Sequence, residues 1–383
     1  MTTGQHQDYM QRALELAAQG IGSVEPNPAV GCVVVKDRRI IGQGFHQRFG
    51  GPHAEINALA DCRNHGFDPA GAMVYVTLEP CCHTGKTGPC TQALIEANVG
   101  AVVAAVQDPS DKIAGKGFDQ LRQAGIDVTV GVCEAQARRL NAPFFKFANT
   151  GRPWVIAKWA QSIDGKLSWR NPPVDGNWIS GSKSRQDVHQ IRRRCQAILV
   201  GVNTIISDNP RLTVRIPGQS IERQPLRVVL DTHLRTPIDC HLTTTAEAPT
   251  LIAASEHAIQ DNHDKAAAFR EAGVELLPVN PCNQNPDLPY LLTELGRRGI
   301  QQLLVEGGPT VLSSFITQHL ADELCVYIAP LLLGQDGIAD MASALNVSAI
   351  PKLCDVKINT FEQDIKISAL LSDDFIRTLL DPS

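Results

Sequence analysis

The chain has 383 residues, a formal net charge of −5 and 43% hydrophobic residues, which is enough apolar sequence for two or three folded domains. Its mildly acidic balance argues against a general binder of nucleic acid or anionic membranes, and no apolar run approaches the ~20 residues of a membrane span. The first residues lack the basic segment and apolar core of a signal peptide, and the eleven cysteines are scattered. We therefore expect a cytoplasmic protein with reduced thiols and no membrane or nucleic-acid partner.

The first half alternates apolar runs with amphipathic segments. A helix is predicted over residues 7–20, where the apolar residues share one face. Buried strands are expected at 29–35, 72–80, 99–106 and 125–132. Helical stretches should separate them, near 54–64, 91–97 and 118–124. This alternation predicts a layered α/β domain over residues 1–148.

A turn-rich segment, Asn149–Pro153, marks the expected domain boundary, and a second α/β pattern follows over residues 152–383. Its strand candidates are 154–160, 197–202, 226–231, 250–254, 301–308 and 324–334. Its helix candidates are 184–194, 266–271 and 310–319. The stretch Pro278–Pro289, rich in Pro and Asn, is expected to be an exposed loop.

The strongest local signal is His53-Ala54-Glu55, followed by Pro80-Cys81 and then by Cys90. One imidazole and two thiolates make a three-ligand zinc set whose open fourth position can hold an attacking water. Glu55, two residues after His53, can face that water as a proton shuttle. Zinc deaminases of bases carry an H-x-E…P-C-x-x-C pattern, although eight residues separate the two thiols here instead of two.

A closed structural zinc site is the alternative, with Cys82 or His83 as its fourth ligand. Cys82 should point away from Cys81 if that segment is extended, so we interpret it as an incidental thiol. The remaining cysteines have no ligand-like spacing and are interpreted as core or surface residues.

Three segments of the first half resemble the deaminase half of the bifunctional riboflavin-biosynthesis deaminase/reductase family. They are PNPAVG (26–31), GFHQRFGGPHAE (44–55) and EPCCHTGKTGPC (79–90). The resemblance implies a cytidine-deaminase-like α/β/α domain in which His53, Cys81 and Cys90 hold zinc and Glu55 moves protons. It further implies that a pyrimidine is bound by Asn27 and His46, and its ribosyl phosphate by His83 and Lys86.

The residues alone support part of this assignment. The loop Thr84–Gly88 offers flexible backbone, hydroxyls and the Lys86 cation, which together can wrap an anion. Without the family, Lys86 is equally explained as a solvated loop lysine and His46 as a structural histidine. An Asx-turn alone explains Asp108-Pro109.

The second half is locally basic, since residues 151–215 carry eleven Lys/Arg and four acids, and this suggests a small polyanionic ligand. Residues 301–316 predict a strand, a Gly-Gly-Pro turn and a helix whose first N–H groups can bind a phosphate. The turn lacks the G-x-G-x-x-G fingerprint, so a standard dinucleotide fold is unsupported.

This half resembles the reductase half of the same family, which has a dihydrofolate-reductase-like α/β fold and uses NADPH. The matching segments are 158–166, 177–180, 185–215 and 303–310. The resemblance places NADPH against Ala160, Trp178, Thr204, Asp208, Gly308, Pro309, Thr310, Val311, Leu312, Ser313 and Ser314. It places the substrate against Gly176, Arg192, Leu212, Arg215 and Glu306, with residues 162–165 as the floor between the two. Gly176 departs from the serine common in the family, so the contact there is open.

We thus expect a homo-oligomeric enzyme, dimeric or tetrameric, that catalyses two consecutive steps of riboflavin synthesis with Zn²⁺ and NADPH. The first deaminates 2,5-diamino-6-ribosylamino-4(3H)-pyrimidinone 5′-phosphate, and the second reduces the ribosyl group to ribityl. Asp208 or Glu306 could serve as the general acid of the reductase. The alternatives are a deaminase of tRNA or free nucleosides with an unrelated reductase attached, and a metal-stabilised ligand-binding or regulatory protein.

Overall fold

The computed structural model describes residues 2–83, 88–110, 114–171, 178–282, 285–345, 352–371 and 374–380. The chain forms two compact units, one made of Met1–Gly151 with Arg377–Ser383 and the other of Arg152–Ile376. In the described ranges, none of the helices is both long enough and apolar enough to cross a membrane.

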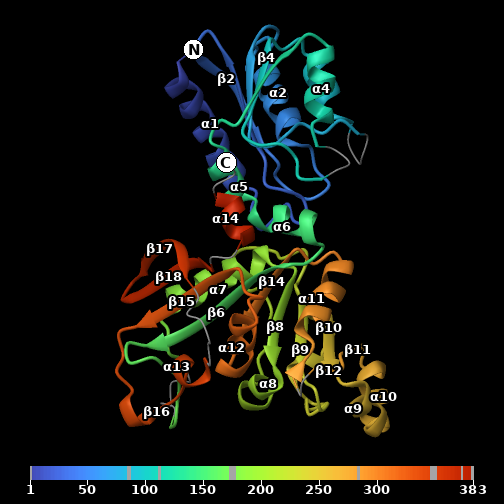
Figure 1. The fold of residues 1–383 in the computed structure, drawn as a ribbon, viewed down its shortest axis with the longest axis vertical. Coiled ribbons are helices and arrows are strands. Elements are labelled where there is room, and N and C mark those ends of the chain that lie inside the picture. The colour runs from blue at the N-terminus through green and yellow to red at the C-terminus, as the bar shows by residue number, and fades with distance from the viewer. Residues whose placement is uncertain are drawn as a thin grey trace. The chain divides into compact units, whose positions relative to one another are not determined.

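A five-stranded sheet forms the centre of the first unit (Figure 1). Its strands are β1 (Gly31–Lys36), β2 (Arg39–Phe45), β3 (Met73–Val76), β4 (Ala101–Ala104) and β5 (Asp127–Val130). Their order is β2-β1-β3-β4-β5; β1 is antiparallel to both neighbours, and β3, β4 and β5 are parallel. Loops that follow the parallel strands therefore gather at one edge, where ligands bind in open α/β sheets.

Helices cover both faces of this sheet. They are α1 (Thr3–Ala18), α2 (Ala54–Asn64), α3 (Cys90–Glu96), α4 (Lys116–Gln123), α5 (Glu134–Leu140) and α6 (Ala142–Thr150). One apolar core joins the side chains of α2, α3 and α4 to the alternate residues of β1, β3 and β4 that face them. Helix α1 buries Met10, Ala13 and Ala17 against the opposite face. The α/β/α layering predicted from the sequence is confirmed.

A nine-stranded sheet forms the second unit, in the order β11-β10-β9-β8-β14-β6-β15-β18-β17. The strands are β6 (Trp154–Ser162), β8 (Ala197–Gly201), β9 (Leu226–Leu230), β10 (Thr250–Ala254), β11 (Glu275–Pro278), β14 (Gln302–Glu306), β15 (Glu323–Ala329), β17 (Leu353–Phe361) and β18 (Asp364–Leu371). The seven strands that begin this order, from β11 through β6 to β15, run parallel to one another. Strand β18 is antiparallel both to β15 and to β17. Two small ladders stand apart, β7 (Lys166–Trp169) with β16 (Gly337–Asp340), and β12 (Pro281–Cys282) with β13 (Asn285–Pro286).

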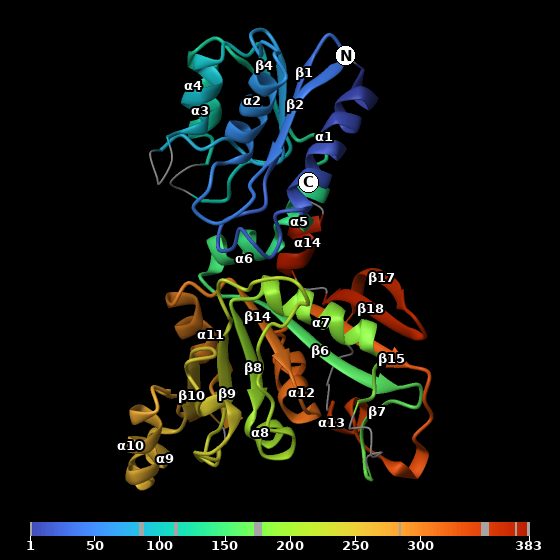
Figure 2. The same cartoon turned by 180° about the vertical axis from the view of Figure 1, so that it is seen from behind.

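The helices of the second unit again lie on both faces. They are α7 (Ser182–Arg194), α8 (Val202–Asp208), α9 (Glu256–Asp261), α10 (His263–Glu271), α11 (Leu288–Arg297), α12 (Pro309–Thr317) and α13 (Met341–Ala344). The last helix, α14 (Asp374–Leu380), spans the division between the two units after Ile376. The apolar faces of α11 and α12 pack on one side of the parallel strands. Figure 2 shows α7 in front of β14 and β6, on the other side.

Several local predictions were wrong or incomplete. The segment Pro278–Pro289 contains the β12–β13 ladder and a buried Val279, so it is not simply an exposed loop. Helix α6 runs through Asn149 to Thr150 and ends where Gly151 adopts φ +66°, so the expected turn begins later. The elements that were not predicted include β2, β7, β11, β16, the β17–β18 hairpin, α5, α6, α8, α9, α11, α13 and α14.

Candidate functional site

Three candidate metal ligands converge in the first unit. His53 directly precedes α2, Cys81 follows β3, and Cys90 is the first residue of α3. Nδ1 of His53 lies 3.5 Å from Sγ of Cys81 and 3.3 Å from Sγ of Cys90. These separations fit a tetrahedral zinc ion, whose nitrogen and sulfur ligands stand about 3.5 Å apart. The structure thus brings the predicted ligand set together, and its donors suit zinc.

Among the residues that the structure describes, no fourth protein ligand joins this cluster. In the described ranges, the group of candidate ligands consists of His53, Cys81 and Cys90, and it includes neither Cys82 nor His83. His83 is exposed at the surface. The closed structural site considered from the sequence is therefore disfavoured, and a three-ligand site that can accept a water is favoured.

Glu55 is the second residue of α2, and its side chain is only 3% exposed. Burial, together with the negative charge of the nearby Cys81 sulfur, raises the pKa of this carboxyl to about 7. A carboxyl group that titrates near neutral pH can both accept and release a proton. Glu55 stands outside the three-ligand cluster, which suits proton transfer better than metal coordination.

His46 and Asn27 lie beside the cluster. The rings of His46 and His53 meet edge to face, with centroids 5.2 Å apart. Nδ1 of His46 lies 3.0 Å from the carbonyl oxygen of Pro52, and its Nε2 lies 3.2 Å from Nδ2 of Asn27. Because a carbonyl only accepts, Nδ1 carries the proton and Nε2 accepts from the amide. Burial lowers the pKa of His46, which favours this neutral form.

Sequence reasoning missed Glu79, a buried carboxyl group two residues before Cys81. Its oxygens accept hydrogen bonds from the backbone N–H groups of Asp108 (3.2 Å), Gly115 (3.0 Å) and Gly117 (2.9 Å). A Cβ at Gly117 would stand 2.2 Å from the carbonyl oxygen of Pro80. Glu79 therefore ties the end of β4 and the start of α4 to the segment that carries Cys81. The sequence gives no signal for this role, because no spacing pattern relates an acidic residue to backbone N–H groups 29 to 38 residues later.

The predicted phosphate contacts are described only in part. His83 is exposed, and Lys86 lies outside the described residues. Asp108 accepts a hydrogen bond from the N–H of Ser110 at 2.8 Å, which is the predicted Asx-turn. Burial raises the pKa of the Asp108 carboxyl, and the charge of His83 acts in the opposite direction, so these two groups are near neighbours.

In the second unit, Arg192 and Glu306 form a two-pronged ion pair. Nε and Nη2 of Arg192 lie 2.8 Å and 2.9 Å from the two carboxylate oxygens of Glu306, and Nη1 donates to the carbonyl of Thr213 at 3.1 Å. Burial opposes ionisation of Glu306, but Arg192 outweighs it and holds the pKa of this carboxyl well below its usual range. Glu306 is thus a poor proton donor at neutral pH, contrary to one of the two possibilities left open by the sequence.

A lysine that sequence reasoning did not assign stands beside this pair. Lys158 on β6 is in register with Glu306 on β14, and its Nζ lies 5.6 Å from the ring centroid of Tyr327. Burial lowers the pKa of Lys158, while Glu306 counteracts that effect. The signal that could have revealed it is a lysine inside the otherwise apolar strand WVIAKWA.

Two further substrate candidates, Leu212 and Arg215, lie on the segment after α8. The backbone N–H of Arg215 donates to Nδ1 of His189 at 3.2 Å, and its guanidinium donates to Oγ1 of Thr213 at 2.6 Å. Leu212 has a left-handed backbone, φ +50°, and a side chain that is 3% exposed. Such a conformation is costly for leucine and fixes the path of the chain toward Arg215. Gly176 lies outside the described residues.

Thr204, Asp208 and the residues from Gly308 to Ser314 follow the ends of β8 and β14, whereas Ala160 lies on β6 and Trp178 precedes α7. A Cβ at Gly201 would stand 2.7 Å from Cγ2 of Val311, and one at Gly307 would stand 2.9 Å from Oγ1 of Thr204, so the two turns touch. A Cβ at Gly308, at the start of α12, would meet nothing within 4 Å. The space beside Gly308 is therefore open in the described part of the chain, and this is compatible with a phosphate of NADPH at the start of α12.

Individual cofactor candidates differ in exposure. Trp178 is 64% exposed and lies under the guanidinium of Arg185, 4.7 Å from the ring centroid. Asp208 is exposed at the last turn of α8, and Ala160 is half-buried on β6. Leu312 is fully buried in the apolar core, so its side chain does not face a ligand.

Asp164 fixes the turn of residues 162–165, which the resemblance places between the NADPH and substrate positions. Its carboxylate accepts hydrogen bonds from Oγ of Ser162 (2.5 Å) and from the backbone N–H groups of Leu333 (3.1 Å) and Gly334 (2.7 Å). These bonds hold the pKa of Asp164 at about 2 and tie the turn after β6 to the loop after β15.

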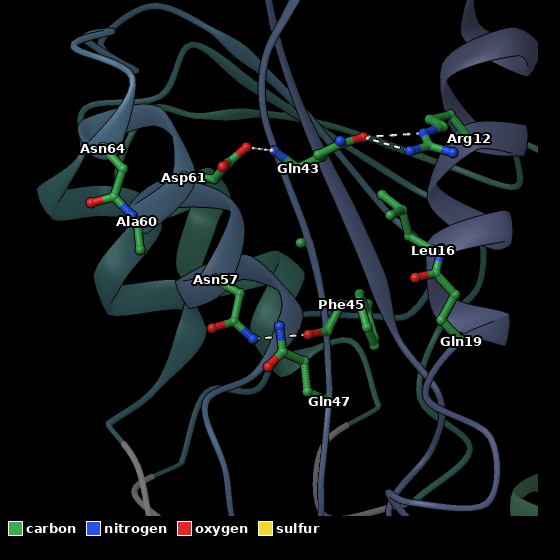
Figure 3. Close-up of a pocket in the computed structure, with 11 residues that line it drawn as sticks. Arg12, Leu16, Gln19, Gln43, Phe45, Gln47, Asn57, Ala60, Asp61 and Asn64 are labelled. Atoms are coloured by element: carbon green, nitrogen blue, oxygen red, sulfur yellow. Dashed lines mark hydrogen bonds between the residues drawn. The ribbon is translucent and has the colours of Figure 1, made fainter. Parts of the chain in front are cut away.

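A separate cavity of about 450 Å³ lies at the edge of the first sheet, between α1 and α2 (Figure 3). Across it, the side-chain oxygen of Gln43 accepts from Arg12, and the N–H of Gln43 donates to Asp61 at 2.9 Å. Nδ2 of Asn57 donates to the carbonyl of Phe45 at 2.8 Å. Its lining includes neither the metal ligands nor Glu55, so we do not assign catalysis to this cavity. Side chains of α2 instead satisfy groups of the edge strand β2.

Two family models match the chain. The model described as "Cytidine and deoxycytidylate deaminase zinc-binding region" matches residues 3–106, and "RibD C-terminal domain" matches residues 153–367. The riboflavin biosynthesis protein RibD of Aquifex aeolicus is 43% identical over 328 residues, which cover 86% of this chain and 88% of that protein. The same protein of Escherichia coli is 41% identical over 344 residues, covering 87% and 89%.

Solved structures of similar proteins share the whole fold. RibD of Acinetobacter baumannii is 37% identical with a TM-score of 0.82, and the match covers 97% of this chain and 100% of that one. The diaminohydroxyphosphoribosylaminopyrimidine deaminase/5-amino-6-(5-phosphoribosylamino)uracil reductase of Thermotoga maritima is 35% identical with a TM-score of 0.80, covering 97% and 99%.

Proposed function

The chain belongs to the RibD family of riboflavin biosynthesis, and from this premise we propose which of its residues perform each of the two reactions. The protein is a zinc-dependent deaminase joined to an NADPH-dependent reductase. It converts 2,5-diamino-6-ribosylamino-4(3H)-pyrimidinone 5′-phosphate to the corresponding uracil and then reduces the ribosyl group to ribityl. We assign deamination to residues 1–148 and reduction to residues 152–383.

In the deaminase, His53, Cys81 and Cys90 hold the zinc ion, which when bound lowers the pKa of a water. Glu55 accepts one proton of that water and gives it to the ring nitrogen while the water oxygen bonds to the carbon that carries the amine. It then moves the remaining proton of that oxygen to the amine, which departs as ammonia when its bond to the carbon breaks. Asn27, fixed by its hydrogen bond to neutral His46, presents its amide to the pyrimidine together with His46. His83 and Lys86 bind the ribosyl phosphate. The convergence of the three ligands beside a buried Glu55 is the observation that carries this proposal.

In the reductase, the ribosyl C1′ gains a hydride, its bond to the ring oxygen breaks, and that oxygen gains a proton. NADPH, when bound, supplies the hydride. Arg192, Leu212, Arg215 and Glu306 hold the substrate, and Arg215 contacts its phosphate. We assign the proton to Lys158, because burial lowers the pKa of its ammonium group while Glu306 is held ionised by Arg192. Neutral Lys158 or a Lys158→Met variant would lack that proton.

NADPH is bound at the carboxyl end of the parallel strands. Gly308 and the residues Pro309, Thr310, Val311, Ser313 and Ser314 take one phosphate through the start of α12, and Thr204, Asp208, Ala160 and Trp178 line the rest. The contact of the two glycine turns and the open space over Gly308 support this placement. For Leu312 the proposal is limited to its backbone.

We further propose a cytoplasmic homo-oligomer, dimeric or tetrameric, that acts on this small molecule and binds no nucleic acid. The net charge of −5 supports the absence of a nucleic-acid partner. Sedimentation equilibrium of the purified chain tests the oligomer, and a monomer at micromolar concentration would exclude it.

The assignment of two phosphate sites is tested by two substitutions in the full chain. Lys86→Ala should weaken only deamination and Arg215→Ala only reduction, each by about 1.5–3 kcal/mol in kcat/KM, as expected for a hydrogen bond to a charged group. Arg63→Ala, at an exposed position on α2, should change neither. Equal loss of both activities in either variant would exclude separate phosphate sites.

A further inference from the structure

A half-buried histidine on α7, His189, has no role in the proposed reactions. It stands one helical turn before Arg192, on the same face of the helix. Its Nδ1 accepts a hydrogen bond from the backbone N–H of Arg215 at 3.2 Å. One turn later, Nη1 of Arg192 donates to the carbonyl of Thr213 at 3.1 Å. The two side chains thus hold residues 213–215 against α7.

The hydrogen bond from Arg215 fixes which nitrogen of His189 carries the proton. Because a backbone N–H only donates, Nδ1 is unprotonated and the proton of the neutral ring lies on Nε2. Burial lowers the pKa of His189 to about 4, an effect that three nearby cations strengthen and one carboxylate opposes. The cations are Arg192, Arg215 and Lys158, and the carboxylate is Glu306. At neutral pH the ring therefore presents one N–H donor.

This Nε2–H donor is open to a ligand. Among the residues that the structure describes, none accepts a hydrogen bond from Nε2 of His189. The charged groups around the ring come from α7, β6, β14 and the segment after α8, and Figure 2 shows α7 in front of β6 and β14. Since positive charges outnumber negative ones here, a small anion suits this position best.

We propose that His189 is a further phosphate-binding residue of the reductase, whose Nε2–H donates to an oxygen of the substrate's 5′-phosphate beside the guanidinium of Arg215. The inference rests on the proposed place of that phosphate at Arg215. Nε and Nη2 of Arg192 are already bonded to Glu306, so this neighbouring arginine has few donors to offer. A neutral imidazole adds a charge-assisted hydrogen bond to the phosphate without adding a fourth cation to a repulsive group.

Two substitutions separate this role from the support that His189 gives to the chain. Asparagine places its amide oxygen near the position of Nδ1, so His189→Asn keeps an acceptor for the N–H of Arg215 and loses the distal donor. Glutamine places its amide NH₂ group near the position of Nε2, so His189→Gln keeps the distal donor and loses that acceptor. The pair therefore tests each ring nitrogen by itself.

The test measures the inhibition constant of ribose 5-phosphate against NADPH oxidation by the full chain, with the already deaminated ribosylamino-uracil phosphate as the varied substrate. This assay reads the reductase alone. His189→Asn should raise the constant on the order of 10- to 100-fold, the size of one hydrogen bond to a charged group, and His189→Gln by much less. The inhibition constant of NADP⁺ should stay unchanged in both variants. Gln190→Asn, at the next and exposed position of α7, is the matched control and should behave as wild type.

Wild-type inhibition by ribose 5-phosphate in His189→Asn would overturn the proposal; if His189→Gln were then the weaker variant, His189 would act only through the backbone of Arg215. Equal loss in both variants would overturn it as well, because the Nε2 donor would not account for the loss. Failure of the underlying placement is recognised separately with Arg215→Ala. An unchanged inhibition constant in this variant would exclude the phosphate from Arg215, and the inference about His189 would fall with it.

Discussion

The surroundings of two buried carboxyl groups, Glu55 and Glu306, shift their pKa values in opposite directions. Glu55 has no cationic partner strong enough to offset its burial, so its pKa rises to about 7. Glu306 meets the full guanidinium fork of Arg192, so its pKa falls despite similar burial. The first is thereby suited to move protons, and the second to remain a charged contact for a sugar or for Lys158.

Replacement of Glu55 by Gln should leave the zinc site intact and remove the proton shuttle. Deamination should fall on the order of 10²–10⁴-fold, the usual size of general acid–base catalysis, while about one zinc remains bound by metal analysis. Reduction of the already deaminated substrate should be unchanged. Near-normal deamination in a zinc-loaded Glu55→Gln protein would contradict the role assigned to Glu55.

The pH dependence of deamination follows from the same group. Glu55 must be unprotonated in the free enzyme to accept a proton, so kcat/KM should fall as the pH drops through its pKa. Bound zinc places a cation nearby and lowers that value, so the acidic limb should lie at or below about pH 7. Steady-state values of kcat/KM from pH 5 to 9 test this prediction. If a Glu55 variant with low activity loses kcat/KM over the same acidic pH range as the wild type, the titration belongs to another group.

The site residues that could be predicted are those that belong to a sequence motif, and those missed have partners far away in the sequence. His53, Cys81 and Cys90 were predictable because zinc ligation needs these residue types and the motif places them together. Glu79 was not, because its partners are backbone N–H groups 29 to 38 residues further along the chain. Lys158 was overlooked because its neighbours come from separate strands.

At the scale of elements, Glu79 joins the loop after β4 to the segment that carries Cys81. Removal of its oxygens in Glu79→Ala leaves three N–H groups without an acceptor, each at a cost of about 1–3 kcal/mol where it stays buried. We expect the deaminase unit to unfold at a lower temperature, and KM for the deaminase substrate to rise more than kcat falls. Glu79→Gln, which keeps one oxygen, should recover part of both losses.

The matched control is Glu15→Ala on α1, where the side chain is 54% exposed and takes part in a surface ion pair. This change should alter stability by less than about 1 kcal/mol. If Glu79→Ala were as stable and as active as Glu15→Ala, the proposed clamp would be absent.

Several strands with a continuous apolar pattern were predicted, but α11 was not predicted although it buries Leu288, Leu291, Leu292 and Leu295 on one face. Strands β1, β4, β8 and β14 are continuous apolar runs, as expected for strands buried on both faces. Strand β2 at the sheet edge carries two glycines and exposed polar residues, so its pattern is weak. Helices α5 and α8 have only seven residues each, too few for a clear helical period.

At the scale of the whole molecule, the proposal assigns the two chemistries to separate sets of residues. The proposed metal ligands and Glu55 all precede residue 91, and the proposed cofactor and sugar contacts all follow residue 151. The change of pattern near Asn149 predicts a division there, and the structure separates into two compact units after Gly151, with the residues from Arg377 onward in the first unit. Each unit has an apolar core of its own.

The most direct test of this account is a two-step assay on the full chain before and after removal of zinc by a chelator. Deamination should disappear, whereas NADPH oxidation with the already deaminated ribosylamino-uracil phosphate should continue at its original rate. Circular dichroism should confirm that the chain stays folded. Loss of hydride transfer in a zinc-free protein that remains folded would contradict the assignment of independent chemistry to the two units.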